Sequence, residues 1–200
     1  NSVRECIKAA RRNGVKYLTL YAFSTENWGR PIEEVNALME LFCKSVVAES
    51  PELVKQGVRV QIIGERRGFS ERVVELIDQI EATTAEGTNL TLVLAFNYSS
   101  RRELMLAMQH VAERVEAGEL RAEDITEQTI AENLMTGSMP DPDLIIRTSG
   151  ECRLSNFLLW QASYAELYFT EVLWPDFDKA ELQKAIEAYA ARERRYGLVK

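Results

Sequence analysis

The amino-acid sequence predicts an α/β fold, a single domain with a mostly parallel central sheet flanked by helices. Short apolar runs typical of buried strands alternate along the chain with longer segments whose apolar residues recur at helical spacing. This alternation is typical of parallel sheets, because each parallel strand needs a crossover to reach the next. With 200 residues and 46% hydrophobic residues, the chain can form one sizeable core. No linker or repeat interrupts it, so one domain is expected over residues 1–200.

The first half of the chain contains three predicted strands, each beside a predicted helix. Apolar positions Val3, Ile7 and Ala10 share one face of the first helix, and Gly14 ends it. Ser70 is a suitable N-terminal cap for a later helix. The expected elements are a helix over 2–13, a strand over 16–23, a polar loop over 24–31, a helix from 32 to about 49, a strand over 58–63, a helix from 70 to about 84 and a strand over 90–96.

The second half continues the alternation and ends on a helix. Asp178 and Glu181 have the D-x-x-E spacing of a helix cap. The expected elements are a polar turn over 97–100, a helix over 101–116, a short helix over 126–134, a buried strand from Asp143, a helix over 156–165, a β-like segment over 168–174 and a last helix to about Arg195.

Composition excludes several classes of function. The net charge is −7 and the pI about 5.0 without a continuous basic stripe, so nucleic acid is not an expected partner. His110 is the only histidine, which argues against a histidine metal site or a Ser-His-Asp triad. Three cysteines without CxxC spacing suit a reducing cytoplasm. The longest apolar run, 92–96, is far too short to span a membrane, so any membrane contact would be peripheral.

A candidate oxyanion site follows the strand that begins near Asp143. Its arginines, hydroxyls and glycine are Arg147, Thr148, Ser149, Gly150, Arg153 and Ser155. Parallel sheets bind ligands at the carboxyl ends of their strands, and arginine grips phosphate oxygens bidentately. The plainer alternative is that these arginines are surface or salt-bridged residues. Further on, Glu166 lies among apolar and aromatic residues, where a carboxylate is either tied to a partner or a metal ligand.

A second candidate site is the loop 24–31, which also follows a strand. Asn27 can hydrogen-bond in both directions and so position a reacting group, and Trp28 offers a flat apolar wall. An ordinary strand-to-helix loop is the alternative. Because the chain has neither GxxxxGK[ST] nor GxGxxG, the expected ligand is a diphosphate held by arginines and a metal. The broad apolar faces of the helices from Ile32 and Ser70 could line a cavity or simply pack in the core.

Two long stretches resemble signatures of the cis-prenyltransferase family. One is YLTLYAFSTENWGRP, followed by EEVNALMELF. The other is DLIIRTSGECRLSNFLLWQASYAELYFTEVLWPDF. The similarity extends from about Ser2 to Tyr196 and is closest to bacterial members. It implies the cis-prenyltransferase fold with a hydrophobic tunnel, and not the all-α fold of the trans-prenyltransferases.

The resemblance implies Mg²⁺-dependent addition of isopentenyl diphosphate, in cis, to an allylic diphosphate such as farnesyl diphosphate. The product would be a long-chain polyprenyl diphosphate such as undecaprenyl diphosphate, the precursor of a lipid carrier for cell-wall synthesis. It also implies a homodimer, which the cysteines place in the cytoplasm, with peripheral membrane contact possible for product release. The tunnel would run between the helices that begin near Ile32 and Ser70, with Leu38, Leu41 and Phe42 as candidate lining residues.

The resemblance also implies roles for individual residues. Asn27 matches the catalytic asparagine, the suggested proton acceptor. Glu166 matches the Mg²⁺-binding glutamate. The positions that match the allylic-substrate loop are Ser24, Thr25, Glu26, Trp28 and Arg30, and those that match the isopentenyl diphosphate site are Arg147, Arg153, Leu154 and Ser155.

Three departures from the family pattern carry expectations of their own. The first signature, a strand ending in DGNGRWA with its Mg²⁺-binding aspartate, is absent. The 200 residues are therefore expected to be a fragment that binds isopentenyl diphosphate without elongating chains. Cys152 stands where many members have His or Gln, so a proton-relay role is not expected at this position. Ser99 and Ser100 replace the usual glycines, and only a backbone adjustment is expected from that change.

Two alternatives to the enzyme stay open at this point. One is the non-catalytic subunit of two-chain cis-prenyltransferases. Such subunits lose the Asn-Trp-x-Arg loop, whereas this chain keeps Asn27, Trp28 and Arg30. The other is a phosphate-binding module without turnover.

Overall fold

The computed structural model describes residues 2–193 and divides into two compact units. The central unit is residues 16–139, and the terminal unit combines 1–15 with 140–200. Each unit contains a sheet, and every strand pairing is parallel. The predicted α/β class with parallel strands and flanking helices is therefore confirmed, but the described strands form two sheets and not the one central sheet predicted. The extent of the domain over residues 1–200 stays a prediction.

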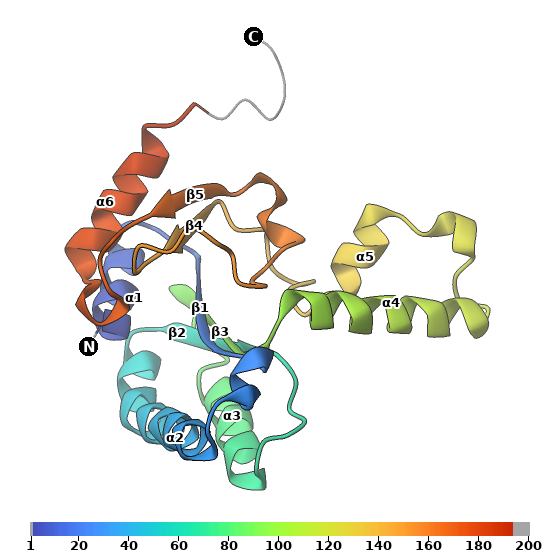
Figure 1. Ribbon diagram of the computed structural model, residues 1–200, viewed down its shortest axis with the longest axis horizontal. Coiled ribbons are helices and arrows are strands. Elements are labelled where there is room, and N and C mark those ends of the chain that lie inside the picture. Colours follow the sequence, from blue (N-terminus) through green and yellow to red (C-terminus); the bar gives the residue numbers. More distant parts are fainter. Residues whose placement is uncertain (1, 194–200) are drawn as a thin grey trace. The chain divides into compact units, whose positions relative to one another are not determined.

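The central unit has a three-stranded sheet with the order β1-β3-β2 (Figure 1). Its strands are β1 (Tyr17–Ser24), β2 (Val58–Ile63) and β3 (Leu90–Tyr98). The apolar run of β3 lies in the middle of this sheet and is almost wholly buried, as expected for a strand covered on both faces. Because the three strands are parallel, the loops that follow them leave from the same edge of the sheet. Both β1 and β3 extend slightly beyond their predicted ends.

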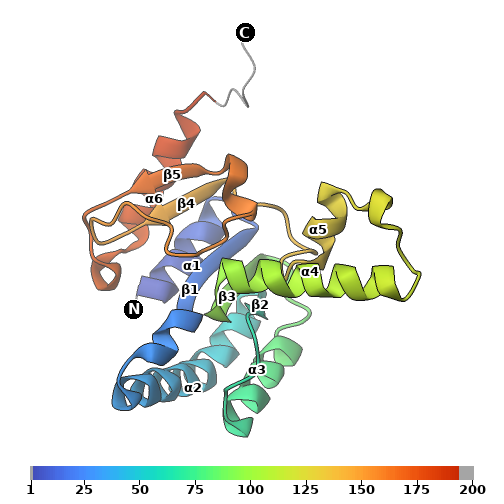
Figure 2. The ribbon, with the colours of Figure 1, turned by 45° about the vertical axis from the view of Figure 1, so that its right-hand side comes forward.

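Two pairs of helices complete the central unit. The helices α2 (Ile32–Lys55) and α3 (Glu71–Thr83) pack against each other and against β2, as Figure 1 shows. The helices α4 (Ser100–Glu116) and α5 (Glu127–Asn133) form the second pair, side by side in Figure 2. Short 3₁₀ turns lie at η1 (Thr25–Gly29) and η2 (Ala122–Asp124).

The helix predicted to end near residue 49 instead runs through Pro51 to Lys55. Proline in a helix removes a single backbone donor, and its cost can be offset by packing. Here the last turn carries the buried side chain of Leu53, and Ser50 Oγ donates to Val46 O at 2.7 Å. Burial of an apolar side chain beyond the proline thus overrides the stop signal in the sequence.

The terminal unit brings together segments from both ends of the chain. Its elements are α1 (Ser2–Arg12), β4 (Leu144–Arg147), η3 (Gln161–Tyr164), β5 (Glu166–Phe169), η4 (Trp174–Asp176) and α6 (Lys179–Ala190). The strands β4 and β5 pair in parallel, and α1 packs against α6 and η4. Ser2 Oγ donates to Pro175 O at 2.7 Å, and Asn13 Nδ2 donates to Gln183 Oε1 at 2.8 Å.

The helix-cap predictions have different outcomes. Asp178 caps α6, since its Oδ1 accepts from Ala180 N at 2.8 Å and Glu181 N at 3.1 Å. These backbone donors hold the pKa of Asp178 below its ordinary value. Ser70 occupies the N-cap position of α3, but its side chain makes no capping hydrogen bond. The helix α6 ends at Ala190, short of the predicted end near residue 195, which itself lies outside the described residues.

Two predictions in the second half are wrong. Residues 156–165 form turns and the short η3 rather than a helix. Ser155, Asn156 and Leu158 have φ values of 52°, 62° and 46°. This left-handed conformation is incompatible with a continuous right-handed helix. The strand expected over 168–174 is β5, which lies earlier and covers four residues.

Candidate active site

The loop after β1 folds into the η1 turn and fixes the side chain of Asn27. Its Oδ1 accepts a hydrogen bond from Ser24 N at 2.9 Å, at the carboxyl end of β1. This contact uses the oxygen of the amide and leaves its nitrogen as the donor. The half-buried Asn27 therefore presents N–H groups from a fixed position at the strand end.

A tyrosine at the base of this loop keeps its proton at neutral pH. Burial and the charge of Glu26 raise the pKa of Tyr21 to about 12, and a hydrogen bond with Ser24 opposes this rise. The Tyr21 hydroxyl donates to Tyr98 O at 3.0 Å, and the two rings meet edge to face at 6.1 Å. The protonated phenol thus joins the end of β1 to the end of β3.

A pocket of about 370 Å³ opens beside the η1 turn. Its lining comes from the ends of all three strands and comprises Thr25, Trp28, Glu65, Arg67, Gly68, Asn97 and Arg102. Arg102 binds Glu65 bidentately, at 2.6 Å through Nε and 2.9 Å through Nη2. This pairing lowers the pKa of Glu65 and neutralises one guanidinium, while Arg67 is exposed. The pocket therefore suits an anion that arrives beside Thr25 and Trp28.

Sequence reasoning missed Glu65, Arg67, Asn97 and Arg102. The signal was present: Glu65 and Arg67 follow β2 closely, and Arg102 follows β3. The same strand-end argument that singles out residues 24–31 applies to both places.

Ser99 takes part in this site through its side chain. Thr25 Oγ1 donates to Ser99 Oγ at 2.8 Å, and Ser99 is 4% exposed. The expectation that serine at this position only adjusts the backbone is therefore wrong, because a glycine could not make this contact. The hydroxyl pair ties the start of η1 to the segment between β3 and α4.

Arg30 follows the η1 turn and pairs with Glu34 at 2.6 Å. Both side chains are 48% exposed, and exposed pairs of this kind contribute about 0–1 kcal/mol. A diphosphate could displace the carboxylate at little cost. The ion pair thus keeps Arg30 near the loop, and Arg30 can leave Glu34 when a diphosphate binds.

In the terminal unit, backbone hydrogen bonds shape the loop that follows Arg147. Ser149 N donates to Val172 O, and Gly150 N donates to Thr170 O, both at 2.9 Å. Gly150 has φ +69°, a left-handed value that favours glycine, and a Cβ there would also require the carboxylate of Glu171 to move. The Nε of Arg147 is buried without a hydrogen-bond partner. A buried guanidinium N–H without an acceptor favours the binding of an oxyanion.

The other predicted residues of the terminal site lie at the surface of that unit. Arg153 is exposed and forms an ion pair with Glu151. Ser155 is exposed with a left-handed backbone, and Leu154 is half-buried. Since an exposed pair is weak, Arg153 can exchange Glu151 for a phosphate.

Glu166 is the first residue of β5 and has a cationic partner. Arg192 Nη1 donates to Glu166 Oε2 at 2.5 Å, and Arg192 Nη2 donates to Leu167 O at 2.9 Å. Among residues 2–193, no three acidic, cysteine or histidine side chains gather as a ready cation site. Glu166 offers one carboxylate, which fits part of the oxygen shell of Mg²⁺ and leaves the rest to other ligands.

The predicted residues therefore fall into two groups. The central unit holds the loop from Ser24 to Arg30, and the terminal unit holds the segment from Arg147 to Glu166. Both groups lie within the part of the chain that matches a known protein family. Residues 1–197 match the family model named "Putative undecaprenyl diphosphate synthase". The chain belongs to this prenyltransferase family.

Curated relatives of this prenyltransferase cover nearly its whole length. It is 51% identical to the isoprenyl transferase of Agrobacterium fabrum over 98% of this chain and 79% of the relative. It is 47% identical to the ditrans,polycis-undecaprenyl-diphosphate synthase ((2E,6E)-farnesyl-diphosphate specific) of Escherichia coli K12, over 98% of this chain and 78% of the relative. The chain is therefore an enzyme, a cis-prenyltransferase, as the resemblance implied.

Solved structures give the same assignment. Lavandulyl diphosphate synthase from Lavandula x intermedia, solved with dimethylallyl diphosphate, has a TM-score of 0.96 at 36% identity, over 98% of this chain and 85% of that one. A probable undecaprenyl diphosphate synthase from Campylobacter jejuni has a TM-score of 0.87 at 34% identity, over 98% and 89%. These matches confirm the predicted cis-prenyltransferase fold.

Proposed function

We propose that this cis-prenyltransferase condenses isopentenyl diphosphate units, in cis, onto farnesyl diphosphate. The product is a long-chain polyprenyl diphosphate such as undecaprenyl diphosphate, from which a carrier lipid for cell-wall synthesis is made. The named activity of the Escherichia coli relative supports the choice of allylic substrate. The observation that carries the proposal is the geometry of Asn27, held by Ser24 N in a loop that retains Trp28 and Arg30.

Asn27 acts where the allylic C–O bond breaks. The departing diphosphate takes the bonding electrons, the terminal carbon of isopentenyl diphosphate attacks the allylic carbon, and one proton passes from the new chain to an oxygen of the released diphosphate. The side-chain nitrogen of Asn27 donates to the diphosphate and so holds in place the oxygens that take up this proton. Ser24, Thr25, Glu26, Trp28 and Arg30 complete the substrate side of this loop.

The terminal unit holds isopentenyl diphosphate. Arg147 and Arg153 bind its phosphate oxygens, Arg153 by leaving Glu151, and Ser155 adds a hydroxyl donor. Leu154 packs against the short isoprenoid. The buried Nε of Arg147 supports this assignment, because a phosphate oxygen would supply its absent acceptor.

A Mg²⁺ ion is the proposed cofactor, and Glu166 is the protein ligand proposed for it. When bound, such an ion neutralises developing charge on the diphosphate oxygens. Mg²⁺ usually takes one or two carboxylates with waters and phosphate oxygens, so a single glutamate suits this role. Arg192 must then release Glu166, which makes metal binding compete with the ion pair seen here.

The homodimer and the place of action are also proposals. Within residues 2–193, none of the helices combines the length and the apolar character that a membrane crossing requires. We propose a cytoplasmic homodimer that touches the membrane only peripherally, where a long prenyl product would be released.

Incorporation of radiolabelled isopentenyl diphosphate tests the proposed function directly. The natural protein, given farnesyl diphosphate and Mg²⁺, should convert label into long polyprenyl products, and chelation of Mg²⁺ should stop it. A second assay measures binding of labelled isopentenyl diphosphate by equilibrium dialysis. Binding without incorporation would instead support a phosphate-binding module, and incorporation that needs a second, different chain would support a partner subunit.

A further inference from the structure

A single buried amide joins the loops at the ends of the three strands of the central unit. Asn97 belongs to β3 and is 5% exposed. Its Oδ1 accepts from Trp28 Nε1 at 2.7 Å. Its Nδ2 donates to Glu65 O at 2.9 Å and to Arg67 O at 3.0 Å. The side chain therefore spans from the η1 turn after β1 to the segment after β2.

The chemistry of these partners determines which side chain fits. The indole N–H can only donate, and the two carbonyls can only accept, so the orientation of the Asn97 amide is unambiguous. An aspartate would keep the acceptor for Trp28 but would face two carbonyl oxygens with negative charge. An apolar side chain would leave buried polar groups unpaired, which is costly.

The backbone around Asn97 reinforces the same junction. Glu65 N donates to Asn97 O at 3.1 Å, and Asn97 has φ 56°, a left-handed value that asparagine tolerates better than most residues. At Gly64 a Cβ would lie 2.0 Å from Phe96 O. The segment after β2 thus touches the end of β3 through its main chain, and the amide of Asn97 extends this contact to Trp28.

The position of Trp28 governs that of Asn27, its neighbour in η1. The Trp28 ring packs edge to face on Phe23 at 5.2 Å and lies 5.8 Å from Phe69. Its N–H is also held by Asn97, so the indole has three fixed contacts although it is 38% exposed. Asn27 therefore cannot shift without disturbing these contacts.

We infer that Asn97 is a positioning residue, which sets the η1 turn and hence Asn27 by holding Trp28 against the Glu65–Arg67 segment. The inference rests on the proposed function of Asn27. Both ends of the Asn97 amide are engaged by Trp28 and this segment, so the residue acts through Trp28. It fixes the geometry of Asn27, and a displacement of about 1 Å in such a group can lower a rate about 10²-fold.

Two substitutions distinguish the effect of losing the Asn97 amide from the effect of backbone strain. Asn97→Ala removes the amide in a left-handed position, whereas Asn97→Gly removes it without that strain. Both should lower kcat for isopentenyl diphosphate incorporation about 10- to 100-fold, with a smaller change in KM for either substrate. Asn89→Ala is the matched control, because Asn89 Nδ2 donates to Gln56 O at 2.8 Å at the other end of the sheet, and it should leave kcat within about twofold.

A double-mutant cycle with Trp28→Phe shows whether Asn97 acts through the indole. Phenylalanine keeps an aromatic ring but has no N–H to donate. The losses in kcat from Asn97→Gly and Trp28→Phe should overlap rather than multiply, while those from Asn89→Ala and Trp28→Phe should multiply. If both Asn97 variants fail to fold, Trp28→Phe alone must still lower kcat at least about threefold.

A spectroscopic readout works without turnover. The contribution of Trp28 is obtained by subtracting the emission spectrum of each protein's Trp28→Phe counterpart from its own. Asn97→Gly should shift this emission to longer wavelength and increase its quenching by acrylamide, and Asn89→Ala should do neither. Unchanged Trp28 emission, or folded Asn97 variants with normal kcat, would overturn the inference. Failure of the parent enzyme to incorporate isopentenyl diphosphate would instead refute the proposed function, leaving the Trp28 measurement valid.

Discussion

At the scale of single residues, only some of the side chains that form the site can be predicted from the sequence. Asn27 and Arg147 stand out because they follow strands and match a long signature. Asn97 does not, since its role depends on a left-handed φ and on contacts with Trp28 and the segment after β2. Contacts between residues about 30 and 70 positions apart leave no local pattern.

The first prediction concerns Asn27. Replacement by alanine should lower kcat about 10²–10⁴-fold, because the group that orients the diphosphate and the departing proton is lost. Steady-state kinetics measure the effect, and circular dichroism checks the fold. Asn36→Ala, at an exposed position of α2, is the control and should behave as the parent. Near-normal turnover of Asn27→Ala would remove this residue from the catalytic machinery.

The second prediction concerns Arg153. Alanine there should raise KM for isopentenyl diphosphate about 10- to 150-fold, more than for farnesyl diphosphate, because a charge-assisted contact of roughly 1.5–3 kcal/mol is lost. Arg121→Ala removes an exposed arginine that is likewise paired with acidic neighbours and should change neither constant. Equal weakening of both substrates would contradict the assignment of Arg153 to one diphosphate.

At the scale of elements, periodicity and end signals located most helices and strands. The strands β1, β2 and β3 and the helices α1, α3 and α4 lie within a few residues of their predicted bounds. Predictions failed where tertiary contacts override local signals. Packing of Leu53 carries α2 past Pro51, and left-handed residues break the segment after Arg153 despite its apolar composition.

The third prediction concerns the proposed tunnel between α2 and α3. Leu38 is half-buried, and Phe42 stacks on Phe96 at 4.1 Å, whereas Leu41 is 61% exposed. Leu38→Trp should therefore shorten the products while early condensations continue, and Leu41→Trp should leave product length unchanged. Thin-layer chromatography of the products distinguishes the outcomes. If Leu38→Trp lowers stability by about 1–3 kcal/mol without shortening products, Leu38 is ordinary core.

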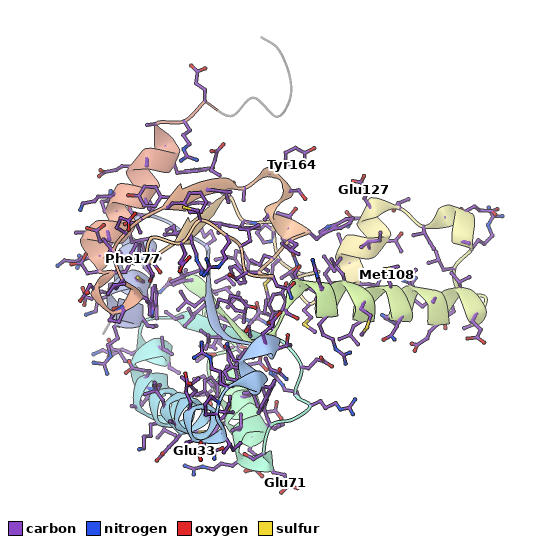
Figure 3. All side chains as sticks on the ribbon, viewed as in Figure 1. Glu33, Glu71, Met108, Glu127, Tyr164 and Phe177 are labelled. Atoms are coloured by element: carbon purple, nitrogen blue, oxygen red, sulfur yellow. The ribbon has the colours of Figure 1, made fainter. Side chains whose placement is uncertain are left out.

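At the scale of the whole chain, the central unit is continuous in sequence and the terminal unit is not. In the terminal unit, α1 buries Cys6 against the segment around Phe177. Phe177, which is labelled in Figure 3, is itself 2% exposed. Burial, with smaller contributions from Asp178 and Glu5, raises the pKa of Cys6 to about 11. In contrast, Cys152 is exposed.

The fourth prediction follows from these thiols. A thiol reagent at pH 8 should modify Cys152 rapidly, and Cys6 and Cys43 only on unfolding, because both are buried. Mass spectrometry of the labelled peptides measures this, and Cys152→Ser should abolish the fast phase. The raised pKa stabilises the folded state below the ordinary thiol value of 9.0, and this contribution is lost as pH rises toward 11. Rapid labelling of native Cys6 at pH 8 would contradict the packing of α1.

The pairing of α1 with α6 has a consequence for how the protein is made. During synthesis, the partners of the apolar face of α1, around residues 174–190, emerge more than 150 residues after it. At translation rates of about 5–20 residues per second, the helix waits roughly 10–30 s for them. The central unit is complete well before that, so it can fold on the ribosome while α1 remains unpaired. During that interval the nascent chain carries the apolar face of α1 without these partners, and an exposed apolar helix face is the kind of segment that chaperones bind.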